Sequence, residues 1–308
     1  MRKTILVTGA SGFLGSAVCR RLSAHGHAVI RTDRRGDVDI IGDLADAEFV
    51  AKLPRVEALV HAAAVQYLSL DLPLWSRRRY FERNNVTAAR NLCNRYAADP
   101  VHVVNVGTSM MYRVCDTASY STNDPMKGQG VYSESKLSAH RLLESSFPEW
   151  TTILPCIIGG PGREGLFKYF VRSIRRFGVA IVPGSGNSPI HLVHVDDVAS
   201  LVCLVVSERH FGFFNAGAPD PLSIFEWIDE IADELGVRKI RRLKVPLLPV
   251  HAASALSGYR LLAREQLIML RQPHVLDVSR SLGAGWSPER SNAHIAREIA
   301  RSIAERDA

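Results

Sequence analysis

The sequence has no long hydrophobic run. Its first apolar stretch, residues 5–7, follows two basic residues and stops at a glycine turn, so it is too short for the core of a secretory signal peptide. No other stretch approaches the roughly 20 apolar residues that a transmembrane helix needs. We therefore expect no signal peptide, no membrane span and no membrane partner, and we expect the protein to be cytoplasmic.

Cysteine is scarce, with five residues among 308. The cysteines are odd in number and scattered, and no two of them stand at a spacing typical of metal ligands. We expect reduced thiols in the core, as in the cytoplasm, and no metal site. The residues are Cys19, Cys93, Cys115, Cys156 and Cys203.

Acidic residues are outnumbered, with 31 Asp and Glu against 38 Lys and Arg, a net charge of +7. The basic clusters at 77–79 and 238–244 are short and far apart, without the basic–aromatic pattern that stacks nucleic-acid bases. We expect no nucleic-acid partner, and we attribute the charge to solvated faces or to an anionic cofactor and substrate. With 46% hydrophobic residues, the chain is long enough for one large domain and a smaller lobe.

A glycine-rich turn stands near the start of the chain. An apolar run, residues 4–7, leads into the sequence TGASGFLG at residues 8–15 and then into an apolar-periodic segment. In a strand–turn–helix unit of this kind, Gly9 permits the tight turn, Gly12 leaves room for a pyrophosphate, and Gly15 lets the helix pack on the strand. The phosphates would lie at the N-terminus of the helix.

The next apolar run, residues 28–32, ends at Asp33, eighteen residues after Gly15. An acid at this position accepts hydrogen bonds from the ribose hydroxyls of adenosine, which favours NAD. Arg34 follows directly and would suit the 2′-phosphate of NADP. We predict that NAD is the preferred cofactor, with NADP as the alternative.

Apolar runs alternate with helical stretches as far as about residue 160. Further strands are expected at 57–61, 101–106 and 151–154, and helices at 84–98 and 132–145. The alternation predicts an α/β fold with a Rossmann-type doubly wound parallel sheet. Proline and glycine become frequent beyond residue 155, so we assign 1–160 to an NAD(P)-binding domain and 161–308 mainly to a smaller C-terminal substrate lobe.

Two helices are expected in the C-terminal lobe. Ser223 and Glu226 have the spacing of a capping box at the start of an apolar-periodic segment, residues 225–235. Residues 292–306 carry isoleucines four positions apart, which is typical of an amphipathic helix.

Tyr132 and Lys136 stand four residues apart in an expected helix, so both lie on one face. A phenol titrates near ~10, and an adjacent cation stabilises its anion and lowers that pKa. Tyr132 is therefore a candidate general acid or base, with Lys136 tuning it. Thr108 and Ser109 follow an apolar strand at the edge where ligands bind in an open parallel sheet, and either would hold the same substrate oxygen. The two pairs together, Tyr132 with Lys136 and Thr108 with Ser109, indicate a catalytic site more specifically than either pair alone.

With these motifs the chain resembles, over nearly its whole length, the extended short-chain dehydrogenase/reductase family, which includes NAD-dependent epimerases, dehydratases and steroid-dehydrogenase-like enzymes. Thr108, four residues before Tyr112, matches the catalytic hydroxyl of that family. The resemblance implies that Tyr132 is the acid/base, that Lys136 also holds the nicotinamide ribose, and that Thr108, helped by Ser109, orients the substrate oxygen. A dehydratase would have an acid in place of Ser109, so dehydration is disfavoured.

The resemblance also implies cofactor contacts and a partner. Family motifs match the glycine turn, an Asp-Leu pair, a strand-end Ala-Ala-Ala segment, an Asn-Val helix and the proline after the catalytic helix. The implied cofactor-binding residues are Gly9, Ser11, Gly12, Phe13, Leu14, Gly15, Asp33, Arg34, Asp43, Leu44, Ala62, Ala63, Ala64, Asn85, Tyr132, Lys136 and Pro155. Later matches imply that about 190–216 returns to the cofactor domain. The family resemblance implies a homodimer through the helices that carry Asn91 and Tyr132.

Three departures from the family pattern bear on the substrate. Nucleotide-sugar members commonly carry Arg-Pro-x-Asn after the catalytic helix and an arginine in a later segment, where this chain has Leu154, Ile157 and Ile190. Isoleucine cannot replace charge-assisted bonds to a diphosphate, which favours a less charged substrate. Basic residues between 168 and 176 would be another route to phosphate, although their spacing is also typical of a solvated helix face.

We therefore predict an NAD(P)-dependent oxidoreductase that transfers hydride between the cofactor and a secondary alcohol or ketone carbon of a small-molecule substrate. One alternative is an NAD-dependent sugar or nucleotide-sugar epimerase. Another is a non-catalytic regulator that senses NAD(P).

Overall fold

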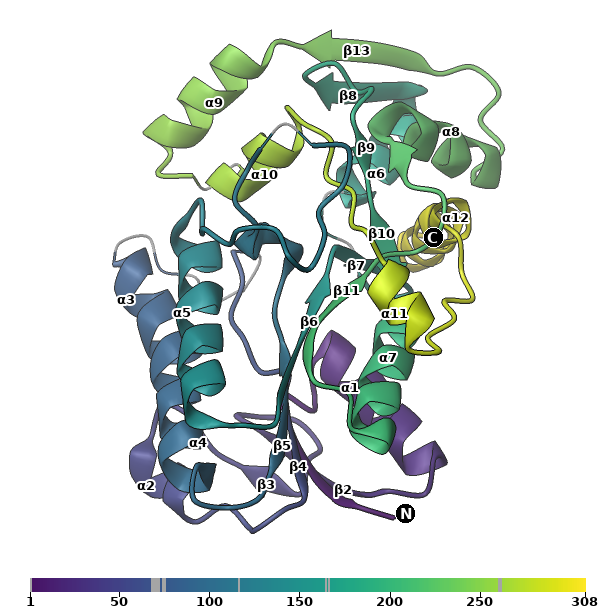
Figure 1. The fold of residues 1–308 in the computed structure, drawn as a ribbon. Coiled ribbons are helices and arrows are strands. Elements are labelled where there is room, and N and C mark those ends of the chain that lie inside the picture. The colour runs from purple at the N-terminus through teal and green to yellow at the C-terminus, as the bar shows by residue number, and fades with distance from the viewer. Residues whose placement is uncertain are drawn as a thin grey trace.

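The computed structural model describes residues 2–67, 73, 76–115, 117–163, 165, 167–259 and 262–308. Within these ranges the central element is a seven-stranded parallel sheet with the strand order β11-β6-β5-β4-β1-β2-β3 (Figure 1). Its strands are β1 (Thr4–Thr8), β2 (Ala28–Asp33), β3 (Ile40–Ile41), β4 (Ala58–His61), β5 (His102–Val106), β6 (Trp150–Pro155) and β11 (Gly212–Ala216). The order changes direction between β1 and β4, which is where a doubly wound sheet opens a crevice for ligands. The predicted Rossmann-type fold is confirmed.

Helices cover both faces of this sheet (Figure 1). On one face α1 (Phe13–Ala24) packs against α7 (Val195–Glu208). The other face carries α2 (Ala47–Ala51), α3 (Arg77–Phe81), α4 (Ala88–Tyr96) and α5 (Val131–Ser146). Strand β1 shows why two layers are needed, because Ile5 and Val7 pack into the core beside α1 while Leu6 packs into the core beside α4.

A second lobe lies beyond the carboxyl ends of the strands, at the top of Figure 1. Three strand pairs, β7–β10, β9–β12 and β8–β13, run through it. These strands are β7 (Ile157–Gly159), β8 (Val179–Pro183), β9 (Pro189–Ile190), β10 (Leu192–His194), β12 (Leu222–Ser223) and β13 (Arg241–Val245). The helices are α6 (Phe167–Phe177), α8 (Ile224–Glu234), α9 (Leu247–Leu256), α10 (Arg264–Met269), α11 (Ser279–Gly283) and α12 (Asn292–Arg306). Buried side chains of α6, α8 and α12 form its core.

The two helices expected in this lobe are confirmed. Helix α12 has the predicted ends, and the hydroxyl of Ser291 caps it by accepting from the N–H of His294. Helix α8 begins with the predicted capping box, in which Ser223 Oγ accepts from the N–H of Glu226 at 3.3 Å and Glu226 Oε2 accepts from the N–H of Ser223 at 2.7 Å.

The helix expected at 84–98 is interrupted. A π-helical turn, η1 (Glu82–Thr87), precedes α4, which ends at Tyr96. The wide turn directs the amide of Asn84 back to the carbonyl of Tyr80 and that of Asn85 into the core against Val65. Apolar periodicity does not distinguish a π turn from an α turn over so short a segment, so the sequence pattern showed only that a helix is present. Among the described helices, none is long and apolar enough to cross a bilayer.

Candidate functional site

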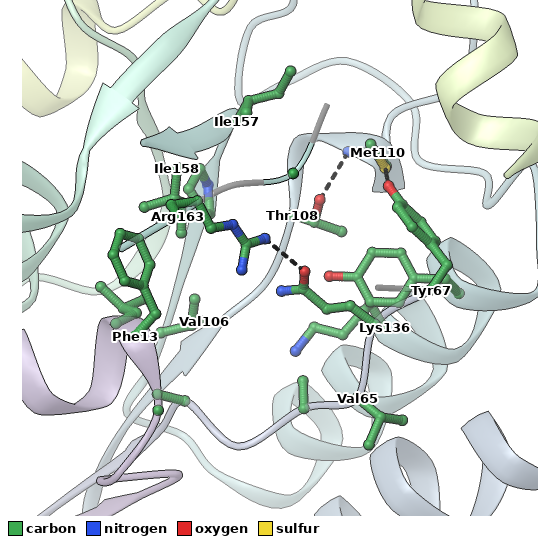
Figure 2. A pocket seen from close by; sticks show the side chains of 18 of the residues that line it. Phe13, Val65, Tyr67, Val106, Thr108, Met110, Lys136, Ile157, Ile158 and Arg163 are labelled. Carbon is green, nitrogen blue, oxygen red and sulfur yellow. Dashed lines mark hydrogen bonds between the residues drawn. The ribbon is translucent and has the colours of Figure 1, made fainter. Parts of the chain in front are cut away.

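A cavity of about 760 Å³ runs along the carboxyl ends of the strands and into the lobe. Its volume is that of a typical ligand site. The glycine-turn end is lined by residues 9 and 11–15, by Asp33 and Arg34, and by residues 42–44. The lobe end is lined by apolar side chains, among them Ile157, Phe167, Phe170, Ile190, Trp227, Leu262, Met269 and Leu270. Figure 2 shows the middle of the cavity together with Phe13 of the glycine-turn end and Ile157 of the lobe end.

The glycine turn brings bare backbone to the cavity. Gly9 has φ +69°, and a Cβ there would lie 2.7 Å from Ala63 Cα, so only glycine fits. A Cβ on Gly12 would have a single near neighbour, the carbonyl oxygen of Gly9 at 3.1 Å, and would otherwise project toward open space. Helix α1 starts at Phe13 without a side-chain cap, so the N–H groups of its first turn are available to an anion.

Asp33 stands at the end of β2 and is tied to this turn. Its Oδ2 accepts hydrogen bonds from the N–H of Ser11 at 3.1 Å and from Ser11 Oγ at 2.7 Å. Its Oδ1 accepts from the N–H of Arg34 at 2.7 Å, while the Arg34 guanidinium donates to Asn84 Oδ1 at 3.1 Å. The carboxylate is therefore held in place on the cavity wall.

Helix α5 presents Tyr132 and Lys136 to the middle of the cavity, and both are nearly inaccessible to solvent. Glu265 of α10 fixes the start of this helix, because one of its carboxylate oxygens accepts from the N–H and the hydroxyl of Ser133, each at 3.0 Å. The ring of Tyr67 meets that of Tyr132 edge-on, with the centroids 5.2 Å apart. These contacts leave Tyr132 little freedom to move.

Thr108 follows β5 and lines the same cavity as Lys136, and its hydroxyl accepts a hydrogen bond from the N–H of Met110 at 3.3 Å (Figure 2). Its side chain forms a hydrogen bond with Tyr132. Burial raises the pKa of Tyr132, and the positive charge of Arg163 and the Thr108 hydrogen bond act in the opposite direction. Burial also lowers the pKa of Lys136 to about 8. The predicted effect of Lys136 on the tyrosine stays a prediction.

Of the predicted cofactor-binding residues, all line the cavity except Asn85. Its Oδ1 accepts from the N–H of Val65 at 2.9 Å and its Nδ2 donates to Ser135 Oγ at 2.9 Å, so it supports the wall from behind. The predicted catalytic residues Thr108 and Ser109 also line the cavity, and Ser109 shares a hydrogen bond of 2.7 Å with His274 of the lobe. The structure therefore brings together most of the residues that the sequence singled out.

Other residues of the cavity wall were missed. Arg163 Nη2 donates to Gln66 Oε1 at 2.9 Å, and the hydroxyl of Tyr67 donates to the sulfur of Met110 at 2.9 Å. Arg163 stands directly after a Gly-Gly-Pro-Gly turn that follows a strand, a setting in which ligand-binding loops are common. That turn was the available signal.

The three residues that depart from the pattern of nucleotide-sugar enzymes lie in different parts of the structure. Ile157 and Ile190 line the lobe end of the cavity, whereas Leu154 is fully buried in β6. The basic residues of α6 do not line the cavity. Arg172 pairs with Asp307 at 2.6 Å, and Arg175 donates to the carbonyl of Ala304, so this face of α6 packs along α12.

Known proteins resemble this chain in sequence and in fold. The chain is 24% identical over 273 residues to a 2-alkyl-3-oxoalkanoate reductase of Stenotrophomonas maltophilia, with 77% of each chain covered. It is 26% identical to a 3-beta-hydroxysteroid dehydrogenase of Mycolicibacterium neoaurum, covering 81% of this chain and 74% of that one. It shares its fold with a UDP-glucose 4-epimerase of Thermus thermophilus in complex with NAD, at a TM-score of 0.77 and 18% identity, with 98% and 99% of the two chains covered.

A family model covers most of the chain. The model describes the NAD dependent epimerase/dehydratase family and matches residues 5–217. That range begins at the second residue of β1 and ends just after β11, so it contains the rest of the parallel sheet, the glycine turn and the Tyr132–Lys136 pair. The chain therefore belongs to the NAD dependent epimerase/dehydratase family.

Proposed function

We propose that the protein is an NAD(P)-dependent oxidoreductase that transfers hydride between its cofactor and a carbon bearing a secondary hydroxyl or keto group. The observation that best supports this function is the meeting of Thr108, Tyr132 and Lys136 on the cavity wall next to the glycine turn. A tyrosine, a lysine and a hydroxyl in one enclosed space are the groups needed to move a proton at a substrate oxygen.

The glycine-turn end fits a dinucleotide. The bare turn and the uncapped start of α1 would hold the pyrophosphate, and the fixed carboxylate of Asp33 would accept from the adenosine ribose, which supports NAD over NADP. Arg34 is the cation that would favour NADP instead. When bound, the nicotinamide supplies or accepts the hydride.

Tyr132 donates its proton to the substrate oxygen in reduction and takes it back in oxidation. Burial holds its pKa above the ordinary value, so the phenol enters the reducing direction in its protonated form. Thr108 keeps the substrate oxygen within reach of this proton. Lys136 is still mostly protonated at neutral pH with a pKa of about 8, and its charge stabilises the phenolate that forms.

Two observations favour dehydrogenation or reduction over epimerisation of a nucleotide sugar. Ile157 and Ile190 make the lobe end apolar, and two of the relatives bear the names of an oxoalkanoate reductase and a hydroxysteroid dehydrogenase. The fold shared with a UDP-glucose 4-epimerase is the observation that keeps the epimerase as second candidate. An epimerase would retain its cofactor and release no net NADH.

The test is turnover by a Tyr132→Phe variant. The protein is first examined for bound nucleotide by absorbance and mass, and then assayed with NAD⁺ or NADH against a panel of secondary alcohols and ketones. We expect Tyr132→Phe to bind the coenzyme normally and to lose about 10²- to 10⁴-fold in kcat. Tyr67→Phe is the matched control, since Tyr67 lies beside Tyr132 but donates to Met110, and it should stay within a few-fold of wild type. Normal turnover by Tyr132→Phe would overturn the proposal.

We further propose a homodimer formed through α4 and α5, the helices that carry Asn91 and Tyr132. The support for it is the family to which the chain belongs. Light scattering of the purified protein measures the mass directly, and the mass of a single chain would reject this arrangement.

A further inference from the structure

Arg163 brings a positive charge into the cavity wall. Its guanidinium donates one hydrogen bond, to the neutral amide of Gln66, and lies 5.7 Å from the centre of the Phe13 ring. Among the described residues, no carboxylate pairs with it. Burial lowers the pKa of Arg163, and the groups that oppose this effect are the phenols of Tyr132 and Tyr67.

A partly buried cation in this state has unused capacity for an anion. The bond to Gln66 uses one N–H of a group that has about five. Moving a charge partly out of water without a partner is unfavourable, and a guanidinium matches the two oxygens of a carboxylate closely. The cavity wall therefore favours an anion that docks against Arg163.

The position of Arg163 would place such an anion near the reacting centre. Arg163, Thr108 and Lys136 line the same cavity, and Figure 2 shows the guanidinium of Arg163 directed from the Phe13 side toward the side that carries Thr108 and Lys136. Arg163 is also the cation that most lowers the pKa of Tyr132. An anionic group on Arg163 would thus lie near the substrate oxygen held by Thr108 and Tyr132.

Apart from Lys136 in the middle of the cavity, the described residues at the lobe end add no second charge. Around the lobe end the described lining residues are apolar or neutral, with Ile157, Phe170, Ile190 and Trp227 on its walls and Gln266 and Tyr169 as uncharged polar members. A diphosphate would be only partly neutralised by one arginine, whereas a carboxylate would be matched. An alkyl or ring system would fill the apolar walls without leaving a buried polar group unpaired.

We propose that Arg163 is the carboxylate anchor of an amphiphilic keto or hydroxy acid, with the carboxylate a few bonds from the reacting carbon and an apolar chain in the lobe end. This inference rests on the proposed function, which places the reacting oxygen at Tyr132 and Thr108. It assigns the substrate class by chemistry, and it makes Arg163 the residue that selects an acid over its neutral analogue.

The anion could have a second source, since Phe13 belongs to the glycine turn and Arg163 would also reach toward a cofactor phosphate. Binding measurements separate the two sources. Decanoate and decanamide, which share an alkyl chain and differ in charge, are titrated into the protein saturated with NAD⁺, and NAD⁺ is titrated separately. Both titrations are repeated with Arg163→Gln and with Arg238→Gln, an exposed arginine away from the cavity that serves as the matched control.

We expect wild type to bind decanoate about tenfold more tightly than decanamide, and Arg163→Gln to lose this difference while its affinity for NAD⁺ stays within about twofold. Arg238→Gln should behave as wild type. Equal affinities of wild type for the two ligands, or no binding of decanoate, would overturn the proposal without use of any variant. A weaker affinity of Arg163→Gln for NAD⁺ with decanoate unaffected would assign the arginine to the cofactor.

These measurements do not use turnover, so they are independent of the catalytic proposal. Tyr132→Phe should bind decanoate as wild type does, because its loss removes the moving proton and leaves Arg163 in place. Failure of the tyrosine test and failure of the carboxylate test are therefore separate results.

Discussion

The two ends of the cavity are built in different ways. The glycine-turn end is built around one continuous segment, residues 9–15, which hydrogen bonds between Ser11 and Asp33 join to the end of β2. The lobe end is assembled from single side chains such as Ile157 of β7, Ile190 of β9 and Trp227 of α8, which are far apart in sequence. Backbone geometry thus constrains the first end, whereas only shape and burial constrain the second, so its ligand preference is open to change by single substitutions.

Acid should destabilise both ends of the cavity, because each end contains a buried histidine that is neutral in the folded protein. Burial lowers the pKa of His61, beside the glycine turn, to about 3, and that of His274, in the lobe, to about 4. The same direction, also to about 4, applies to His102, His140 and His191. Unfolded histidines take up protons near 6.5, whereas the folded ones do so only at much lower pH. Stability is therefore complete above pH 6.5 and should fall by several kcal/mol toward pH 4.

Denaturant unfolding at a series of pH values measures this loss. His274→Gln should show a shallower dependence between pH 6.5 and 4 than wild type, since it removes one such group. His25→Gln, at an exposed position, should leave the profile unchanged. A free energy of unfolding that is flat across this range would contradict the account.

A substitution at Gly12 should separate the two ends most sharply. The side chain of Gly12→Val would project into the space assigned to the pyrophosphate, near the carbonyl of Gly9 and little else, so folding should survive. We expect affinity for NAD⁺ to fall by about 100-fold or more in calorimetric titration, because the backbone can no longer approach the phosphates. Gly283→Val, with no atom near its Cβ position, is the control and should bind normally. Unchanged affinity in Gly12→Val would remove the glycine turn from the cofactor site.

A substitution at Asp33 tests whether the glycine-turn end selects NAD⁺ over NADP⁺. Asp33→Ser removes the carboxylate that would repel a 2′-phosphate and leaves Arg34 beside it. The ratio of the dissociation constants for NAD⁺ and NADP⁺ should shift by about tenfold or more toward NADP⁺. Asp37→Ser, at a fully exposed aspartate, should leave the ratio as it is. If Asp33→Ser also leaves it unchanged, the ribose contact is wrong.

The smallest effect is expected at the lobe end. Ile157→Asn places an amide in the apolar wall, which should weaken binding of decanoate about fivefold because the amide loses its water without gaining a partner. Coenzyme affinity should not change. Ile41→Asn, at an exposed isoleucine of β3, should affect neither ligand. A large change in coenzyme affinity for Ile157→Asn would show that the two ends are not independent.

The same difference between the two ends of the cavity explains which features could be predicted from the sequence. The parallel sheet, α5, α8 and α12 follow from apolar periodicity and caps, which act between near neighbours in the chain. The glycine turn with Asp33 is likewise recognisable, because its residue types are dictated by backbone approach. Arg163 was missed because its position depends on the path of a loop and on Gln66, about a hundred positions away in the sequence. A motif also marked Asn85 without showing that its amide would turn toward Val65.

The measurement that tests the central claim most directly is calorimetric titration of the purified protein with NAD⁺ and, separately, with NADP⁺. The account predicts saturable one-to-one binding of NAD⁺ that is tighter than binding of NADP⁺, with the glycine-turn end as the site. Absence of heat with either coenzyme, in protein whose absorbance and mass show no nucleotide already bound, would contradict it.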